Sequence, residues 1–264
     1  MSVYKVHAIK YASIPGRRSK DNFIGGDPHD RPMPMAFFVW AITGEDGKTI
    51  VVDTGYDEAS GRERGWPVER PVQKGLEAIG VDANAVQDVI ITHMHWDHAG
   101  NHELFPNARF HVQEKEMQYC TGRCMCHHRL RRPYALGDVT RMVHRLYEGR
   151  VAFHDGSSQI ADGLSVHLLG GHTLGMQCVR VRTRRGWLVL ASDAAHFWDN
   201  VELDKPFPEF LDVAKLLDGN ALMKSLADSP LHVIPGHDPL VLQRFPAPER
   251  TVDIARLDAD PIAG

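Results

Sequence analysis

The sequence predicts a layered α/β protein in which two β-sheets pack together with helices on the outside. Three observations predict this fold class. Strands and helices are mixed along the 264 residues. They fall into two halves, each with hairpin-forming strands followed by strand–helix units. One strand candidate, MAFFVWAIT at residues 35–43, is apolar without interruption, as expected when both faces of a strand are covered.

The first half of the chain begins with strands and turns. Strands are predicted at 3–9, where polar and apolar residues alternate, at 35–43, and at 48–55. The residues EDG at 45–47 predict a hairpin turn between the second and third of these strands. Residues 14–34 are rich in proline, glycine and charge, so we expect a loop, and a loop this long in a compact domain is often functional.

The rest of the chain alternates helices and strands. Predicted helices cover 69–80, which Gly80 closes, the segment beginning at 113–120, and 208–228. Residues 121–150 are polar and basic, and we expect them to be only partly helical. The remaining predicted strands are 88–92, 108–112, 164–170, 176–183, 186–192 and 231–236.

Composition excludes several classes of function. A net charge of −4 and a pI near 6.5 argue against a nucleic-acid partner. No apolar run reaches the roughly 18–20 residues that span a bilayer, so no membrane association is expected. The N-terminus does not resemble a secretory signal, and the four cysteines show no disulfide framework. We therefore expect a cytoplasmic protein. Its 16 histidines are the unusual feature, since histidine is a common metal ligand.

Four potential metal ligands lie close together in THMHWDHAG, residues 92–100. His93, His95 and Asp97 are spaced two residues apart, so in an extended segment their side chains share one side. We expect a helix to begin at His98, with Asp97 near its N-cap. His98 would then point elsewhere, and this arrangement suits two metal positions better than one.

Three more loops carry matching groups, each after a predicted strand. His172 lies in the glycine-rich loop GGHTLG, Asp193 directly follows a buried strand, and His237 lies in a tight Pro-Gly turn. A lone histidine of this kind is usually structural, and four polar residues on one loop could simply be solvated. Several such residues, each at a strand end beside glycine, indicate a shared binding site instead.

The motifs HMHWDH, GGHTLG, ASD and PGHD, in this order and spacing, resemble those of the metallo-β-lactamase superfamily. The resemblance extends over nearly the whole chain, including VVDTG at 51–55. It implies an αββα sandwich with a metal site at one edge of the two sheets. The chain would be one domain, 1–264, with a basic, partly helical insertion at about 119–150. The ligands implied by the resemblance are His93, His95 and His172 for one metal, Asp97, His98 and His237 for the second, and Asp193 as a bridge.

The proposed ligands are imidazoles and carboxylates without a thiolate. Zinc is therefore the first expectation, and iron, manganese or cobalt would also be tolerated. Two such metals can share a water and deprotonate it at neutral pH, so that hydroxide attacks a carbonyl. Asp97 could then pass a proton to the leaving group. Asp53 either orients the histidine loop through a hydrogen bond or caps a turn before Gly55.

Chain length and the long N-terminal loop most resemble the N-acyl-homoserine lactonases and the related pyridoxolactonases. We therefore expect hydrolysis of a small-molecule lactone, and the resemblance is compatible with a homodimer. A broad esterase or phosphoesterase on the same site is an alternative. A non-catalytic metal-binding module is another, although such a protein is expected to have lost ligands.

Substrate specificity depends on residues outside the ligand set. The lactonases commonly have tyrosine three residues after the bridging aspartate, whereas this chain has His196. His196 could donate a hydrogen bond to an oxyanion, act as an acid, or merely fill space. The insertion Cys120–Arg132 does not have the spacing of paired zinc ligands. Its arginines could meet a substrate carboxylate or form a solvated face. Candidate pocket residues, for which core packing is the alternative, are Met33, Met35, Phe37, Phe38, Trp96, Phe197 and Trp198.

Overall fold

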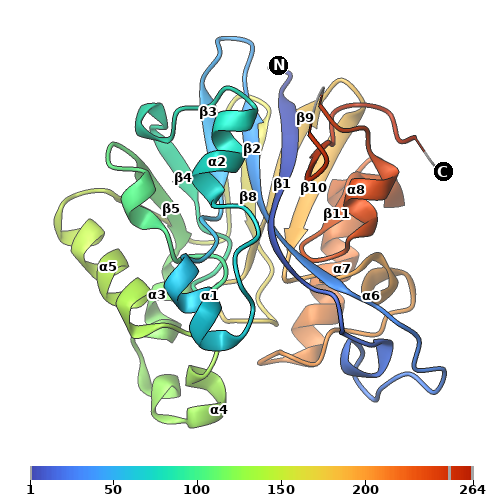
Figure 1. Cartoon of the computed structure of the whole chain (residues 1–264). Coiled ribbons are helices and arrows are strands. Elements are labelled where there is room, and N and C mark those ends of the chain that lie inside the picture. The colour runs from blue at the N-terminus through green and yellow to red at the C-terminus, as the bar shows by residue number, and fades with distance from the viewer. Residues whose placement is uncertain (1, 249–250, 263–264) are drawn as a thin grey trace.

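Two mixed β-sheets, stacked face to face, form the centre of the computed structural model, which describes residues 2–248 and 251–262 (Figure 1). The first sheet has the strand order β12-β1-β2-β3-β4-β5-β6. Its first four strands pair antiparallel, and β3 to β6 run parallel. The bounds of these strands are β1 Lys5–Ile14, β2 Met35–Thr43, β3 Thr49–Val52, β4 Asp88–Ile90, β5 Arg109–Gln113, β6 Val151–His154 and β12 Ile254–Arg256.

The second sheet has the order β11-β10-β9-β8-β7. Only β10 and β11 run parallel in it. The bounds of these strands are β7 Ser157–Ala161, β8 Leu164–Leu168, β9 Gln177–Thr183, β10 Gly186–Ser192 and β11 Val233–Pro235. Both sheets are therefore mixed, which is the arrangement of an αββα sandwich.

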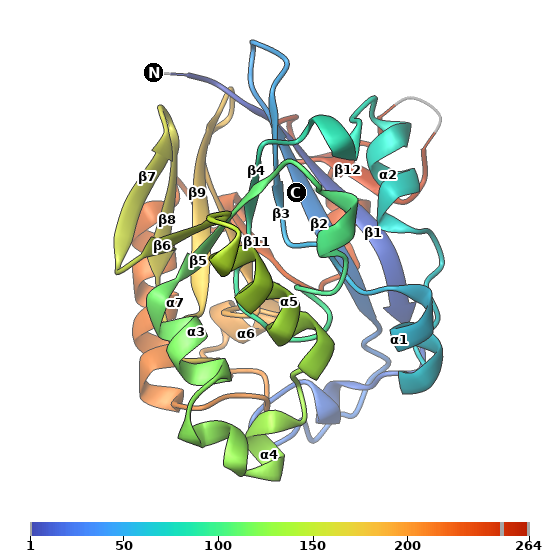
Figure 2. The same ribbon diagram turned by 90° about the vertical axis from the view of Figure 1, so that its left-hand side faces the viewer.

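Helices cover both outer faces of the sandwich (Figures 1 and 2). Residues of α2, α3 and α5 pack against the first sheet, and α7 packs against the second. The helices are α1 Glu58–Arg64, α2 Val72–Ala78, α3 Glu114–Cys120, α4 His128–Arg131, α5 Leu136–Tyr147, α6 Trp198–Glu202, α7 Val213–Leu226 and α8 Leu240–Arg244. Short 3-10 helices lie at Ser19–Asp21, Ala83–Ala85, His102–Leu104, Arg123–Cys126 and Pro230–His232.

The strand β2 shows why the layers stack in this way. Trp40 and Ile42 point between the two sheets, whereas Val39 and Ala41 face the helices and join the cluster around Leu76 of α2. Eight of its nine residues are therefore buried, and burial of apolar side chains on both faces stabilises the stack. This agrees with the prediction of a doubly covered strand.

The predicted fold class is confirmed, but several short elements were missed. The edge strands β6 and β7 are partly exposed, so their sequences lack a clear apolar pattern. The strand β12 pairs with β1, which lies near the opposite end of the chain. No local sequence signal predicts such a pairing. The helix α1 does carry a local signal, since the side chain of Asp57 accepts a hydrogen bond from the amide of Ser60 at 2.7 Å. Within the described part of the chain, no helix is long and apolar enough to cross a bilayer.

Candidate metal centre

Loops at one end of the two sheets bring the seven predicted ligands together. THMHWDHAG follows β4, Asp193 follows β10, His237 follows β11, and His172 lies between β8 and β9. In each group one ligand atom per residue lies within 4.8 Å of the others, and all these side chains are buried. The two groups are His93, His95, His172 and Asp193, and Asp97, His98, Asp193 and His237.

Asp193 is shared between the two groups, with one carboxylate oxygen facing each. Its Oδ2 lies 3.2 Å from Nε2 of His172 and 3.7 Å from Nε2 of His93. Its Oδ1 lies 2.8 Å from Nε2 of His237 and 3.1 Å from Nε2 of His98. One carboxylate is therefore in position to contact two cations.

In three of the histidines, Nδ1 points away from the centre and lies within hydrogen-bonding distance of an oxygen atom. Nδ1 of His98 lies 2.8 Å from Oδ2 of Asp53, which also accepts a hydrogen bond from the hydroxyl of Thr92. Nδ1 of His172 lies 2.7 Å from the carbonyl oxygen of Glu209, and Nδ1 of His237 lies 2.8 Å from that of Ala36. Such contacts fix the ring orientation, and they direct Nε2 toward the centre.

The donor atoms inside the site fit bound cations. Nε2 of His93 is buried, and it makes no hydrogen bond to another described residue. Buried ring nitrogens normally have a partner, and a metal ion would supply one. Burial lowers the pKa of His93 and of His95 well below the usual value, which keeps both imidazoles in the neutral form that binds metals.

The site also concentrates negative charge. Burial by itself would lower the pKa of His98, but the nearby carboxylates, Asp193 foremost, raise it well above its usual value. Although burial opposes ionisation of Asp97, its neighbouring histidines lower its pKa to about 2. These ionised carboxylates create a potential that attracts cations.

The local structure of the histidine loop differs from the prediction in one respect. No helix begins at His98, and residues 96–98 form a turn instead. The amides of His98 and Ala99 both bond to the carbonyl oxygen of His95, but the amide of Gly100 bonds to Gly55 at 2.7 Å. Helical hydrogen bonding therefore ends at Ala99, and no helix continues from this turn. Because the chain bends at His95, Asp97 groups with His98 rather than sharing a side with His93.

Glu116 was not among the predicted site residues. Its buried carboxylate on α3 accepts hydrogen bonds from the amides of Met94 at 2.8 Å and Gly175 at 3.1 Å. It also accepts from the hydroxyls of Thr173 at 2.6 Å and Tyr134 at 3.1 Å. Glu116 thus joins the two loops that carry the three histidines of the first ligand group. The sequence signal is a glutamate in line with Tyr119 and Cys120, three and four residues later, on the buried face of the helix.

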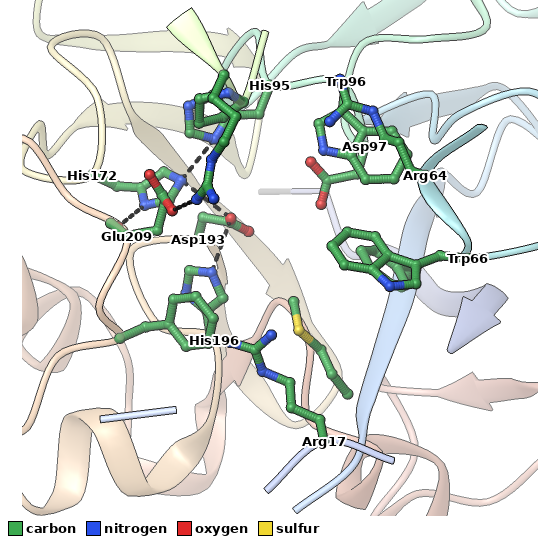
Figure 3. Close-up of a pocket in the computed structure, with 15 residues that line it drawn as sticks. Arg17, Arg64, Trp66, His95, Trp96, Asp97, His172, Asp193, His196 and Glu209 are labelled. Carbon is green, nitrogen blue, oxygen red and sulfur yellow. Dashed lines mark hydrogen bonds and ion pairs between the residues drawn. The ribbon is translucent and has the colours of Figure 1, made fainter. Parts of the chain in front are cut away.

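A pocket of about 420 Å³ opens onto both ligand groups (Figure 3). Of the predicted pocket residues, it includes Met35, Phe37 and Trp96. Phe197 and Trp198 lie elsewhere in the core, and the indole of Trp198 donates to the carbonyl oxygen of Val233 at 2.8 Å. The lining residues that sequence reasoning missed are Arg17, Arg64, Trp66, Pro133, Phe207 and Glu209. They come from loops and a helix end, where no local pattern predicts a shared cavity.

His196 lines this pocket as well. Its ring stacks on Phe207 with centroids 3.7 Å apart, and its Nε2 lies 3.1 Å from Oδ2 of Asp193. Burial lowers the pKa of His196 to about 3, so the imidazole is neutral near pH 7. Its Nδ1 is buried and has no hydrogen-bond partner in the described ranges. A neutral ring carries one N–H, and the contact with the Asp193 carboxylate assigns it to Nε2, so any hydrogen bond that the ring donates comes from that nitrogen.

Comparisons with known proteins agree on one family and one fold. The metallo-beta-lactamase superfamily pattern matches residues 33–246. The N-acyl homoserine lactonase AttM of Rhizobium johnstonii is 28% identical over 246 residues, covering 85% of this chain and 89% of that relative. One similar solved structure is an N-acyl homoserine lactone hydrolase with the product N-hexanoyl-L-homoserine bound at its catalytic metal center. Its TM-score is 0.70 at 20% sequence identity, and the match covers 90% of this chain and 95% of that chain. AidC, a dizinc quorum-quenching lactonase, has a TM-score of 0.66 at 16% sequence identity, and the match covers 90% of this chain and 91% of the AidC chain.

Proposed function

The chain belongs to the metallo-beta-lactamase superfamily, and from this membership we propose that it is a metal-dependent hydrolase that opens a lactone ring. The observation that carries the proposal is the pair of ligand groups that share Asp193 beside an open pocket. The likeness to AttM, whose name gives N-acyl homoserine lactonase activity, supports a lactone as the substrate class. An N-acyl-homoserine lactone or a related cyclic ester would fit a pocket of about 420 Å³.

We propose that His93, His95 and His172 hold one divalent cation, that Asp97, His98 and His237 hold the second, and that Asp193 bridges them. Zinc is the proposed metal, because the donors are imidazoles and carboxylates and because AidC is a dizinc protein. Two cations bound there would acidify a shared water and polarise the substrate carbonyl.

The side chains around the reacting ester have separate tasks in this proposal. Asp97 is ionised when the substrate arrives, so it can accept a proton from the attacking water and deliver it to the leaving alkoxide. His196 would hold the substrate oxygen by a hydrogen bond from Nε2–H, which it shares with the carboxylate of Asp193. Trp96 and Phe37 shield this part of the pocket from water, which strengthens both interactions.

A substrate panel tests the proposed reaction. The metal-loaded protein is assayed with acyl-homoserine lactones, aromatic lactones, aryl esters and phosphotriesters, and its metal content is measured. We expect about two metals per chain and lactone turnover that chelation abolishes and added zinc restores. A preference for aryl esters or phosphotriesters would move the assignment to the alternative esterase or phosphoesterase. A fully loaded protein that is inert to the whole panel would instead be a metal-binding module.

Substitutions of His196 test its proposed role. His196→Ala is expected to lower kcat/KM for the lactone roughly a hundredfold, which is typical for loss of one donor to an oxyanion. His196→Tyr is expected to recover part of this loss because the phenol also donates a hydrogen bond. His144→Ala, on α5 and outside the pocket, is the control. If both His196 variants leave every rate in the panel unchanged, His196 only fills space.

A further inference from the structure

Three arginines line the pocket over the candidate metal centre: Arg17, Arg64 and Arg132. Outside the two ligand groups, only one carboxylate, Glu209, lines it among the described residues. The walls of the pocket therefore carry excess positive charge, which is unexpected in a site for a neutral acyl lactone.

Two of these guanidinium groups already have protein partners. Nη2 of Arg132 lies 2.7 Å from Oε2 of Glu209, so the charge of this arginine is balanced. Nη2 of Arg17 donates to the carbonyl oxygen of Asp21 at 2.8 Å, and its Nε donates to the side chain of Asn22. Both guanidinium groups therefore already have polar partners within the wall of the pocket.

Arg64 is different. Within residues 2–248 and 251–262, its guanidinium makes no hydrogen bond, and no carboxylate oxygen lies within ion-pair distance. The guanidinium lies over the face of Trp96, whose ring centroid is 4.3 Å away. Burial lowers the pKa of Arg64, although the charge of Asp97 opposes this, and the group nevertheless stays protonated. A charge that is partly withdrawn from water without a hydrogen-bonding partner is costly, and an incoming anion would offset that cost.

The surroundings of Arg64 also favour a flat ligand. The rings of Trp66 and Trp96 have centroids 5.5 Å apart, and Phe37 lies 5.9 Å from Trp66. Together they form an aromatic wall, in which Phe37 and Trp96 are buried and Trp66 is partly exposed, so that a ligand ring can stack on Trp66. Figure 3 places Arg64 beside Trp96 and Asp97, on the opposite side of the pocket from His172 and Glu209. A ring that lies along this wall can therefore reach Arg64 with one end and the ligand groups with the other.

We infer that Arg64 binds a carboxylate of the substrate, and that the preferred substrate is an anionic cyclic ester built on a flat ring. This inference rests on the proposed lactone hydrolysis and specifies its substrate class. The planar guanidinium fork matches a carboxylate with two parallel hydrogen bonds. A single guanidinium balances one negative charge, which favours a carboxylate over a dianionic phosphate. Arg64 is thus a specificity-determining residue, while the bond-breaking step is left to the ligand groups.

The test compares two lactones that differ in a single carboxylate, phthalide and 5-carboxyphthalide, with the metal-loaded protein. We expect the wild-type chain to have a kcat/KM for 5-carboxyphthalide roughly tenfold or more above that for phthalide, mainly through a lower KM. Arg64→Gln is expected to reduce this ratio about tenfold, and Arg64→Lys to reduce it less. The matched control is Arg62→Gln, because Arg62 lies on the same helix, is exposed, and pairs with Glu58 at 3.2 Å. It should preserve the ratio.

A binding measurement separates failure of this inference from failure of the proposed function. The ring-opened products, 2-(hydroxymethyl)benzoate and its 4-carboxylated form, are titrated into the wild-type and Arg64→Gln proteins by calorimetry. Tighter binding of the dicarboxylate that depends on Arg64 supports the inference, even if neither lactone is opened and lactone hydrolysis is wrong. Equal binding of the two products, or an equal kcat/KM ratio in the Arg64→Gln and Arg62→Gln variants, would overturn it. Lactone opening without any carboxylate preference would also overturn it while leaving the proposed function intact.

Discussion

Replacing Asp193 with asparagine is expected to lower lactone hydrolysis by roughly a thousandfold or more, because both of the proposed cations would lose a shared ligand. Each oxygen of this carboxylate faces a different group, at 3.2 Å from Nε2 of His172 and at 2.8 Å from Nε2 of His237. An asparagine side chain has no charge and only one oxygen. Metal content per chain should therefore fall from about two toward zero, as measured by elemental analysis after gel filtration.

The matched control for this substitution is Asp199→Asn, six residues along the chain. The carboxylate of Asp199 pairs with Arg31 and does not belong to either ligand group. This variant removes the same charge but should retain both metals and the wild-type rate. If Asp193→Asn also kept about two metals per chain and most of its activity, the bridging role proposed for Asp193 would be wrong.

Replacing Glu116 with alanine is expected to destabilise the metal-free protein by about 3 kcal/mol or more. The substitution leaves the amides of Met94 and Gly175 and the hydroxyl of Thr173 buried without their acceptor. Urea unfolding of the metal-free protein measures this loss. Because Glu116 ties together the loops that hold His95 and His172, affinity for one metal should also fall by roughly 10–100-fold.

Two further variants distinguish loop positioning by Glu116 from a general loss of stability. Glu116→Gln keeps the shape and one acceptor oxygen, so it should recover part of the stability but still weaken metal binding. Glu114→Ala, at an exposed position of the same helix, should change neither property. In a competition titration with a chelator, an unchanged affinity for both metals in Glu116→Ala would show that Glu116 is structural only.

Much of the fold and of the candidate site can be predicted from the sequence because the signals are local. Unbroken apolarity in β2 indicates a strand covered on both faces, and the structure confirms it. His93, His172, Asp193 and His237 each follow a strand, and the loops after these strands lie at the same end of the two stacked sheets. The resemblance of the motifs implied the ligand set, whose members lie together in the structure, but it did not imply how the chain turns after His95.

Long-range contacts decided what the sequence left open. The helix expected at His98 is absent because the amide of Gly100 bonds to Gly55, 45 positions earlier. The strand β12 exists only through its pairing with β1. Neither feature has a local pattern, because the stabilising partner is supplied by a distant part of the chain.

The sequence by itself determined the fold class and the types of donor atom in the candidate centre, because strand periodicity and residue type can be read from the chain without its fold. Only the tertiary structure revealed Glu116 as the link between two loops and Arg64 as a partly buried cation that pairs with no carboxylate among the described residues. Both conclusions depend on what surrounds a side chain in space. The free-energy cost of burying a charge depends on the atoms around it in space and not on its neighbours in the sequence.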